Sequence, residues 1–86
     1  MKEVWDPHCW TIKGREKIFG PNPELMKTSL ARPFRLLDGD DEVYFLGEMY
    51  SIDPGSETDF APLDDFGAGF GCTSIQYKGE TGWETL

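Results

Sequence analysis

The sequence contains few of the residues that carry covalent or metal chemistry. Histidine occurs once, at His8, and cysteine twice, at Cys9 and Cys72, in a chain of 86 residues. Two cysteines are too few for a disulfide scaffold, and a structural zinc site uses four ligands. Neighbouring residues of an extended chain point to opposite faces, so His8 and Cys9 are poorly placed to share a metal or to form a catalytic dyad. We therefore expect free thiols, no metal, no cofactor and no enzymatic activity.

Long apolar runs are also absent. The longest stretch without a charged side chain, residues 66–77, is rich in glycine and shorter than the roughly 20 apolar residues that a membrane-spanning helix needs. The first residues, MKEVW, contain no apolar segment of signal-peptide length. We expect a cytoplasmic protein that does not bind membranes.

Positive charge is scarce in most of the chain. Eight basic and sixteen acidic residues give a net charge of −8. Residues 1–33 hold six basic and four acidic residues, a net charge of +2, whereas residues 34–86 hold two basic and twelve acidic residues, a net charge of −10. We expect one domain, 1–86, with a near-neutral first part and an acidic second part. This balance argues against direct binding of nucleic acid and favours a protein partner with a basic, nucleic-acid-binding surface.

Turn-forming residues divide the chain into short elements. The pattern predicts strands at residues 9–13, 17–19, 33–38, 42–50, 72–77 and 83–86, with an Asp-Gly turn at residues 38–39. Asn22 followed by Pro23 predicts the start of a helix that ends before Pro33, with Leu25, Met26, Leu30 and Ala31 on its apolar side. A connection at residues 51–71 contains an Asp53-Pro54-Gly55 turn and one helical turn near residues 62–66. The fold class is α+β, a small antiparallel sheet of four to six strands, including two hairpins, with one or two short helices.

The two hairpins define the expected core. Residues 42–50 are apolar on both faces, which predicts a central strand that is covered on both sides. The apolar positions that we expect to be buried are Phe34, Leu36, Val43, Phe45, Ile75 and Tyr77.

Clustered carboxylates invite more specific interpretations, which fail on spacing. An EF-hand loop that began at Asp38 would need glycine at its sixth position and glutamate at its twelfth, but these positions are Val43 and Met49. Residues 67–71 are rich in glycine yet lack the lysine and hydroxyl residue of a phosphate-binding loop. Asp64 and Asp65 would diverge by about 100° on a helical turn, which does not suit a catalytic carboxylate pair.

The acidic side chains fall mainly on the expected turns and loops, where carboxylates reach solvent. The candidate partner-binding residues are Asp38, Asp40, Asp41, Glu42, Asp59, Asp64, Asp65 and Phe66. A surface of this kind can occupy a basic groove by placing carboxylates where phosphates normally bind. The alternative is that the net charge serves only solubility.

Three segments resemble a group of short plasmid- and prophage-borne proteins of unknown function. They are RPFRLLDGDDEVYF (residues 32–45), FAPLDDFG (residues 60–67) and GCTSIQY (residues 71–77). The resemblance covers about residues 32–86 and implies no catalytic or ligand residues. The short, acidic, cofactor-free profile also resembles anti-CRISPR and other anti-defence inhibitors in type.

Together these observations predict a non-enzymatic inhibitor from a mobile genetic element. Its partner would be a CRISPR effector or another defence nuclease in the host bacterial cell, bound through a phosphate-mimicking surface. The alternative is an accessory β-rich interaction domain of unknown ligand, which could form a homodimer and whose acidity serves only solubility.

Overall fold

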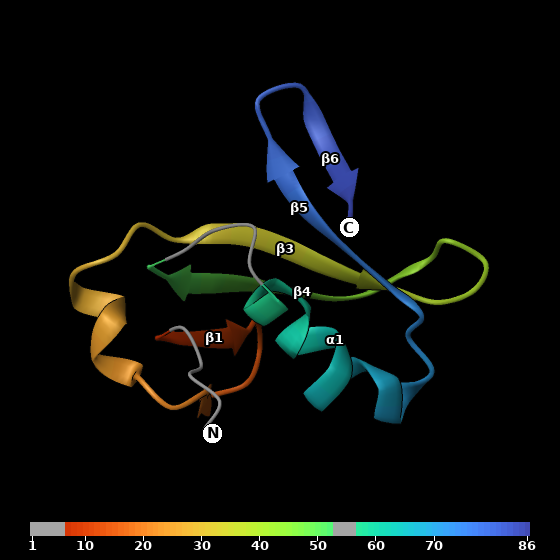
Figure 1. The fold of residues 1–86 in the computed structure, drawn as a ribbon. Coiled ribbons are helices and arrows are strands. Elements are labelled where there is room, and N and C mark those ends of the chain that lie inside the picture. The colour runs from red at the N-terminus through yellow and green to blue at the C-terminus, as the bar shows by residue number, and fades with distance from the viewer. Residues whose placement is uncertain (1–6, 53–56) are drawn as a thin grey trace, which may run out of the picture.

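The computed structural model describes residues 7–52 and 57–86 and contains one six-stranded antiparallel sheet (Figure 1). The strands are β1 (His8–Ile12), β2 (Ile18–Phe19), β3 (Arg32–Leu37), β4 (Val43–Ser51), β5 (Ser74–Gly79) and β6 (Gly82–Thr85). Their spatial order is β2-β1-β4-β3-β5-β6. The helical elements are the 3-10 helices η1 (Pro23–Lys27), η2 (Glu57–Phe60) and η3 (Gly67–Phe70) and the α-helix α1 (Ala61–Asp65). The predicted α+β class with an antiparallel sheet is confirmed.

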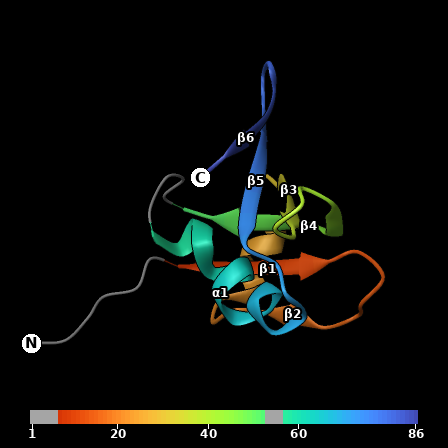
Figure 2. The same ribbon diagram turned by 90° about the vertical axis from the view of Figure 1, so that its right-hand side faces the viewer.

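Hairpins account for most of the sheet. The β3–β4 hairpin forms at the predicted Asp-Gly turn, and the β5–β6 hairpin closes between Gly79 and Gly82. Gly82 has a φ of 132°, a conformation that side-chain-bearing residues rarely adopt. The β5–β6 hairpin rises away from the rest of the molecule, as both ribbon views show (Figures 1 and 2).

The helix expected after Asn22 is shorter than predicted. It is the five-residue η1, and the Asn22 side chain does not cap it. The Asn22 Oδ1 atom instead accepts a hydrogen bond from the backbone N–H of His8 (3.2 Å), which ties η1 to β1. Leu25 alone of the expected apolar stripe is buried, whereas Met26, Leu30 and Ala31 are exposed. A 3-10 helix repeats every three residues, so the stripe predicted for an α-helix does not form.

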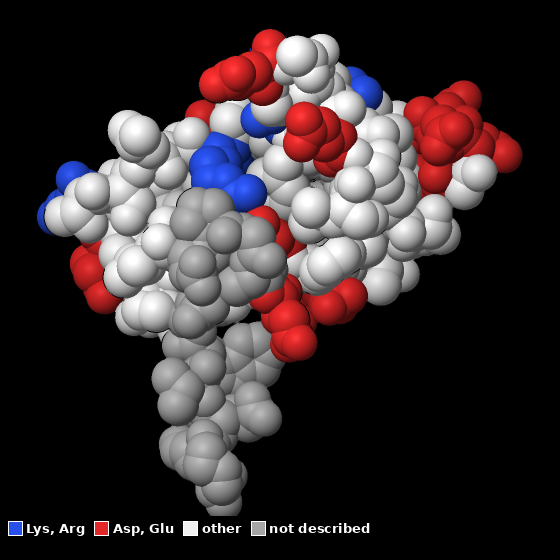
Figure 3. Space-filling view, turned by 45° about the horizontal axis from the view of Figure 1, so that its top comes forward, with Lys and Arg blue, Asp and Glu red and all other residues white. Residues whose placement is uncertain are grey.

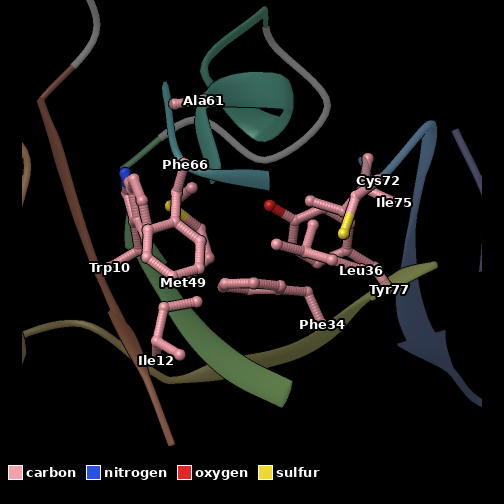
Figure 4. Packing of buried hydrophobic residues seen from close by; sticks show 10 residues of the cluster. All are labelled: Trp10, Ile12, Phe34, Leu36, Met49, Ala61, Phe66, Cys72, Ile75 and Tyr77. Atoms are coloured by element: carbon pink, nitrogen blue, oxygen red, sulfur yellow. The ribbon is translucent and has the colours of Figure 1, made fainter. Parts of the chain in front are cut away.

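The main core lies between one face of the sheet and the helical segment 57–70, which comprises η2, α1 and η3. The Trp10 indole stacks on Phe19 with ring centroids 4.3 Å apart, and Phe34 and Phe66 meet it edge-on at 6.3 and 6.2 Å. Figure 4 shows the rings of Trp10, Phe34 and Phe66 gathered beneath the helical segment. The buried members of this cluster are Trp10, Ile12, Phe34, Leu36, Met49, Ala61, Phe66, Cys72, Ile75 and Tyr77.

Four of the six predicted core residues, Phe34, Leu36, Ile75 and Tyr77, are buried as expected. Phe45 is only partly buried and packs against Phe66 and Phe70. Val43 is 43% exposed, so its predicted burial is wrong. The β3–β4 register shifts between Leu36 and Leu37, and a strict two-residue alternation does not hold across such a shift.

The opposite face of the sheet is covered only in part. Leu25 from η1 packs on Cys9 and Tyr50 and forms a second, smaller cluster. Nearer the start of β4, Tyr44 is 48% exposed and Leu46 is 42% exposed. The predicted central position of this strand is confirmed, but the expectation that both of its faces are covered is wrong.

The Asp53-Pro54-Gly55 turn lies outside the described residues. Within the described residues, no helix has the length and apolar character that crossing a lipid bilayer requires.

Candidate partner-binding site

The β3–β4 turn presents the first group of predicted acidic residues. The backbone N–H groups of Asp40 and Glu42 both donate to Asp38 Oδ1, at 2.8 and 2.9 Å. Asp41 follows in the left-handed conformation, with a φ of 65°. The hydrogen bond from the Glu42 N–H, followed by the one from Asp40, lowers the pKa of Asp38. Asp38 therefore orders the turn, while the carboxylates of Asp40, Asp41 and Glu42 are exposed.

Apolar side chains adjoin this acidic turn. Val43 and Tyr44 are both exposed and follow Glu42 directly. A hydrogen bond with the Asp38 carboxylate raises the pKa of Tyr44, so the phenol is linked to the turn and is neutral at physiological pH. The turn thus combines exposed carboxylates with exposed apolar surface, as the contact region of an interface requires.

The second acidic group surrounds a shallow cavity at α1. The cavity has a volume of about 410 Å³, and Asp64 and Asp65 are exposed at its wall. Its lining residues are Glu57, Phe60, Ala61, Asp64 and Asp65. The Phe60 side chain is 39% exposed, so the cavity offers an aromatic ring beside three carboxylates. Such a combination suits a lysine or arginine side chain, which both carboxylates and ring faces attract.

Two of the predicted partner-binding residues lie inside the protein. Asp59 is 1% exposed, and its two carboxylate oxygens accept hydrogen bonds from Arg32 Nη1 and Nη2 at 2.8 and 3.0 Å. Phe66 is a core residue that packs against Trp10 and Phe45. Neither side chain is presented to a partner, because the helical segment 57–70 folds onto the sheet through both of them.

The remaining six candidates occupy two separate places. Asp38, Asp40, Asp41 and Glu42 lie at the β3–β4 turn, whereas Asp64 and Asp65 lie on α1. Figure 3 shows acidic groups at the turn on the right, near the helical segment below and over the β5–β6 hairpin at the top, with uncharged and basic surface between them. The acidic residues therefore form several small groups instead of one continuous patch.

Sequence reasoning missed the contacts that cations make with rings. The Arg32 guanidinium lies 4.6 Å from the Tyr77 ring centroid and Arg35 lies 4.4 Å from that of Trp83. Arg15 lies 5.3 Å from the Phe66 centroid. In the sequence these partners are far apart. The pairing of β3, β5 and β6 brings together the first two pairs, and the packing of the helical segment on the sheet brings Phe66 to Arg15.

The two cysteines are free and lie in different clusters. Cys9 packs with Leu25 and Tyr50, whereas Cys72 belongs to the main core. Burial raises the pKa of both thiols. Within the described residues, no three histidine, cysteine, aspartate or glutamate side chains are placed to hold a metal ion.

Thiol burial leads to a labelling prediction. Because the thiolate is the reactive species and both thiols are buried and protonated, we expect iodoacetamide at neutral pH to modify the folded protein at least tenfold more slowly than the protein in urea. Mass spectrometry over time measures both rates. Equal rates for the folded and the unfolded protein would contradict the placement of both cysteines.

Comparison with known proteins identifies no relative. No family model matches the chain, and neither a curated protein nor a solved structure has significant similarity to it.

Proposed function

We propose that this protein is a non-enzymatic inhibitor from a mobile genetic element. It binds the basic, nucleic-acid-binding surface of a host defence complex, such as a CRISPR effector, and its exposed carboxylates take the place of phosphates. The observation that carries the proposal is the pairing of carboxylates with exposed apolar side chains at two places, the β3–β4 turn and the α1 cavity.

The α1 cavity supports the proposal through its size and its lining. A volume of about 410 Å³ accommodates one long side chain. The carboxylates of Asp64 and Asp65 can pair with a cationic head group, while Phe60 contacts the head group or its apolar stem. A cation that is partly removed from water in this way contributes more than a pair at the exposed rim of an interface.

The β3–β4 turn supports the proposal through its order. The Asp38 carboxylate accepts hydrogen bonds from two backbone N–H groups of the turn. The neighbouring carboxylates therefore have little conformational freedom to lose on binding. Val43 and Tyr44 supply the apolar surface that excludes water around a charge pair.

The proposal is tested by paired charge reversals. We expect D40K/D41K and D64K/D65K each to weaken binding to the partner at least tenfold, because an attraction is replaced by a repulsion at each place. The matched control is E16K/E24K, which makes the same change in charge at exposed residues of the near-neutral first part, and we expect it to change binding less than threefold. The partner is first isolated from a bacterial lysate at about 50 mM salt and released at about 500 mM salt, since added salt screens exposed charges. Inhibition of the isolated nuclease is then measured with each variant.

Three outcomes contradict the proposal. Both reversals could inhibit as strongly as the parent protein, the control could lose as much as they do, or the isolated partner could have no nucleic-acid-binding activity. Circular dichroism and thermal melting of each variant separate a loss of binding from a loss of folding.

A second candidate function is that of an accessory interaction domain that forms a homodimer, with its acidity serving solubility. The observation that favours it is the exposed Tyr44 and Leu46 on the partly covered face of the sheet. Sedimentation velocity distinguishes the candidates, because an inhibitor of the proposed kind requires no self-association.

A further inference from the structure

The strand register brings cations together on the sheet face that lies opposite the helical segment 57–70. The backbone N–H of Lys13 donates to the carbonyl oxygen of Leu46 (2.7 Å), and Leu46 pairs with Arg35 on the next strand. Arg35 pairs with Gln76 of β5, and two residue pairs further along that strand Lys78 pairs with Trp83 of β6. Side chains alternate along each strand, so these residues face away from the core that contains Phe34 and Tyr77. We call this the open face; it comprises Thr11, Lys13, Pro33, Arg35, Leu46, Glu48, Gln76, Lys78, Trp83 and Thr85.

The open face contains a groove of about 590 Å³. Leu46 and Pro33 form apolar parts of its lining, Lys13 lies on the β1 side, and Lys78 and Trp83 lie on the side of the β5–β6 hairpin. This volume is within the range of roughly 300–1,000 Å³ that is typical of small-ligand sites. The groove therefore holds apolar surface between two cations, with the Glu48 carboxylate also in its lining and an indole ring at one side.

Hydrogen bonds fix the aromatic side of the groove. The Arg35 guanidinium lies over the Trp83 ring at 4.4 Å, and Arg35 Nε donates to Gln76 Oε1 (2.7 Å). Gln76 Nε2 in turn donates to Thr85 Oγ1 (2.9 Å). Trp83 and Arg35 are thus held in place before any ligand arrives.

The charge of the open face is opposite to that of the whole protein. It carries three cations, Lys13, Arg35 and Lys78, and one acid, Glu48, a net charge of +2, whereas the whole chain carries −8. Glu48 accepts a hydrogen bond from the Tyr50 hydroxyl (2.9 Å). Among the described residues, a salt bridge forms between Arg32 and Asp59, and the three cations of the open face take part in none. Within that part of the chain no carboxylate forms a salt bridge with these three charges, while Arg35 and Lys78 both lie over the Trp83 ring, at 4.4 and 5.9 Å from its centroid.

We propose that the groove binds a short stretch of single-stranded nucleic acid. Lysine and arginine side chains attract the phosphates, and an indole stacks with a base irrespective of its sequence. A sheet face with this combination binds unstacked bases, which a duplex does not offer. An acidic peptide could use the cations but would leave the indole unused, so the presence of Trp83 favours a nucleotide ligand.

The site is short and independent of the proposed inhibitory surface. Beyond Leu46, β4 leads back to the acidic turn at residues 38–42, whose carboxylates repel a longer strand. The variants D40K/D41K and D64K/D65K also leave all three cations of the open face unchanged. Failure of one proposal therefore leaves the other intact.

Fluorescence anisotropy of a labelled thymidine decamer at low salt tests the proposal. We expect the parent protein to bind the decamer and to bind a duplex of the same length at least tenfold more weakly. K78E is expected to weaken binding at least tenfold, whereas K27E, which makes the same change in charge at an exposed residue of η1, is expected to change it less than threefold. W83A is expected to weaken binding about fivefold or more, and W83F, which retains an aromatic ring, to preserve most of it.

Four outcomes would overturn the proposal. They are the absence of decamer binding, equal effects of K78E and K27E, a W83A variant that folds and binds like the parent, and equal competition by a poly-glutamate peptide of the same charge. Sedimentation velocity adds a fifth, because a dimer that K78E dissociates would show that a second copy occupies the groove.

Discussion

Replacing Gly47 by alanine is expected to abolish the cooperative unfolding transition of this protein. Gly47 lies in the middle of β4, opposite Ile12 of β1 and Phe34 of β3. A Cβ atom at this position would overlap the backbone carbonyl oxygen of Thr11 and would lie 2.5 Å from Phe34 Cζ. The carbonyl oxygen is part of the β1 backbone, so relieving the overlap requires separation of two central strands.

The size of this effect follows from the small stability of a short domain. Overpacking a core typically costs about 1–3 kcal/mol and sometimes more, whereas the stability of small domains begins at only about 5 kcal/mol. The Phe34 ring is fully buried and packs against Trp10 and Tyr77, so it cannot move aside without opening the core. We therefore expect the cost to exceed the usual range.

Gly39→Ala is the matched control. Gly39 lies in the β3–β4 turn, and a Cβ atom there would meet no atom within 4 Å. We expect this variant to melt within a few degrees of the parent in circular dichroism. A G47A variant that also melts within a few degrees would show that the packing of Phe34 over Gly47 is wrong.

Glycine at position 47 illustrates which parts of the fold the sequence could predict. The two hairpins depend on local signals, such as the Asp-Gly turn at residues 38–39 and the apolar runs beside it. The role of Gly47 depends on Phe34 and Thr11, which neighbouring strands place beside it. A lone glycine in a strand indicates a close approach without naming the residue that approaches. The same holds for Val43, whose exposure follows from a register shift that alternation alone does not predict.

In the candidate site, too, the features that depend on local sequence were predictable and those that depend on distant residues were not. Carboxylates on a sharp turn reach solvent, so the exposure of Asp40 and Asp41 followed from the local sequence. The sequence predicts a surface position for Asp59, because residues 51–71 have the pattern of a connection, whereas its burial depends on Arg32, 27 positions earlier. The open face could not be recognised either, because only strand pairing places Lys13, Arg35 and Lys78 on the same face of the sheet.

Replacing Arg32 by methionine is expected to destabilise the protein strongly. Arg32 makes a bidentate salt bridge with Asp59, and the Tyr77 hydroxyl donates to the backbone carbonyl oxygen of Asp59 (2.8 Å). These contacts fix the helical segment 57–70 to β3 and β5. Removing one partner of a buried ion pair costs about 3–5 kcal/mol, because the other charge stays in a poorly solvated position. Arg32 itself is partly exposed, with 27% of its side chain accessible, so we expect the lower end of this range.

A double-mutant cycle separates the charge from the packing. D59N removes the buried carboxylate charge that Arg32 neutralises, so we expect R32M/D59N to recover at least half of the stability that R32M loses. Urea unfolding of the parent, both single variants and the double variant gives the coupling free energy. K27M, at an exposed lysine of η1, controls for the loss of a cation and is expected to change the stability by less than about 0.5 kcal/mol. If R32M is no less stable than K27M, or if adding D59N to R32M lowers the stability further, the salt bridge does not hold the helical segment on the sheet.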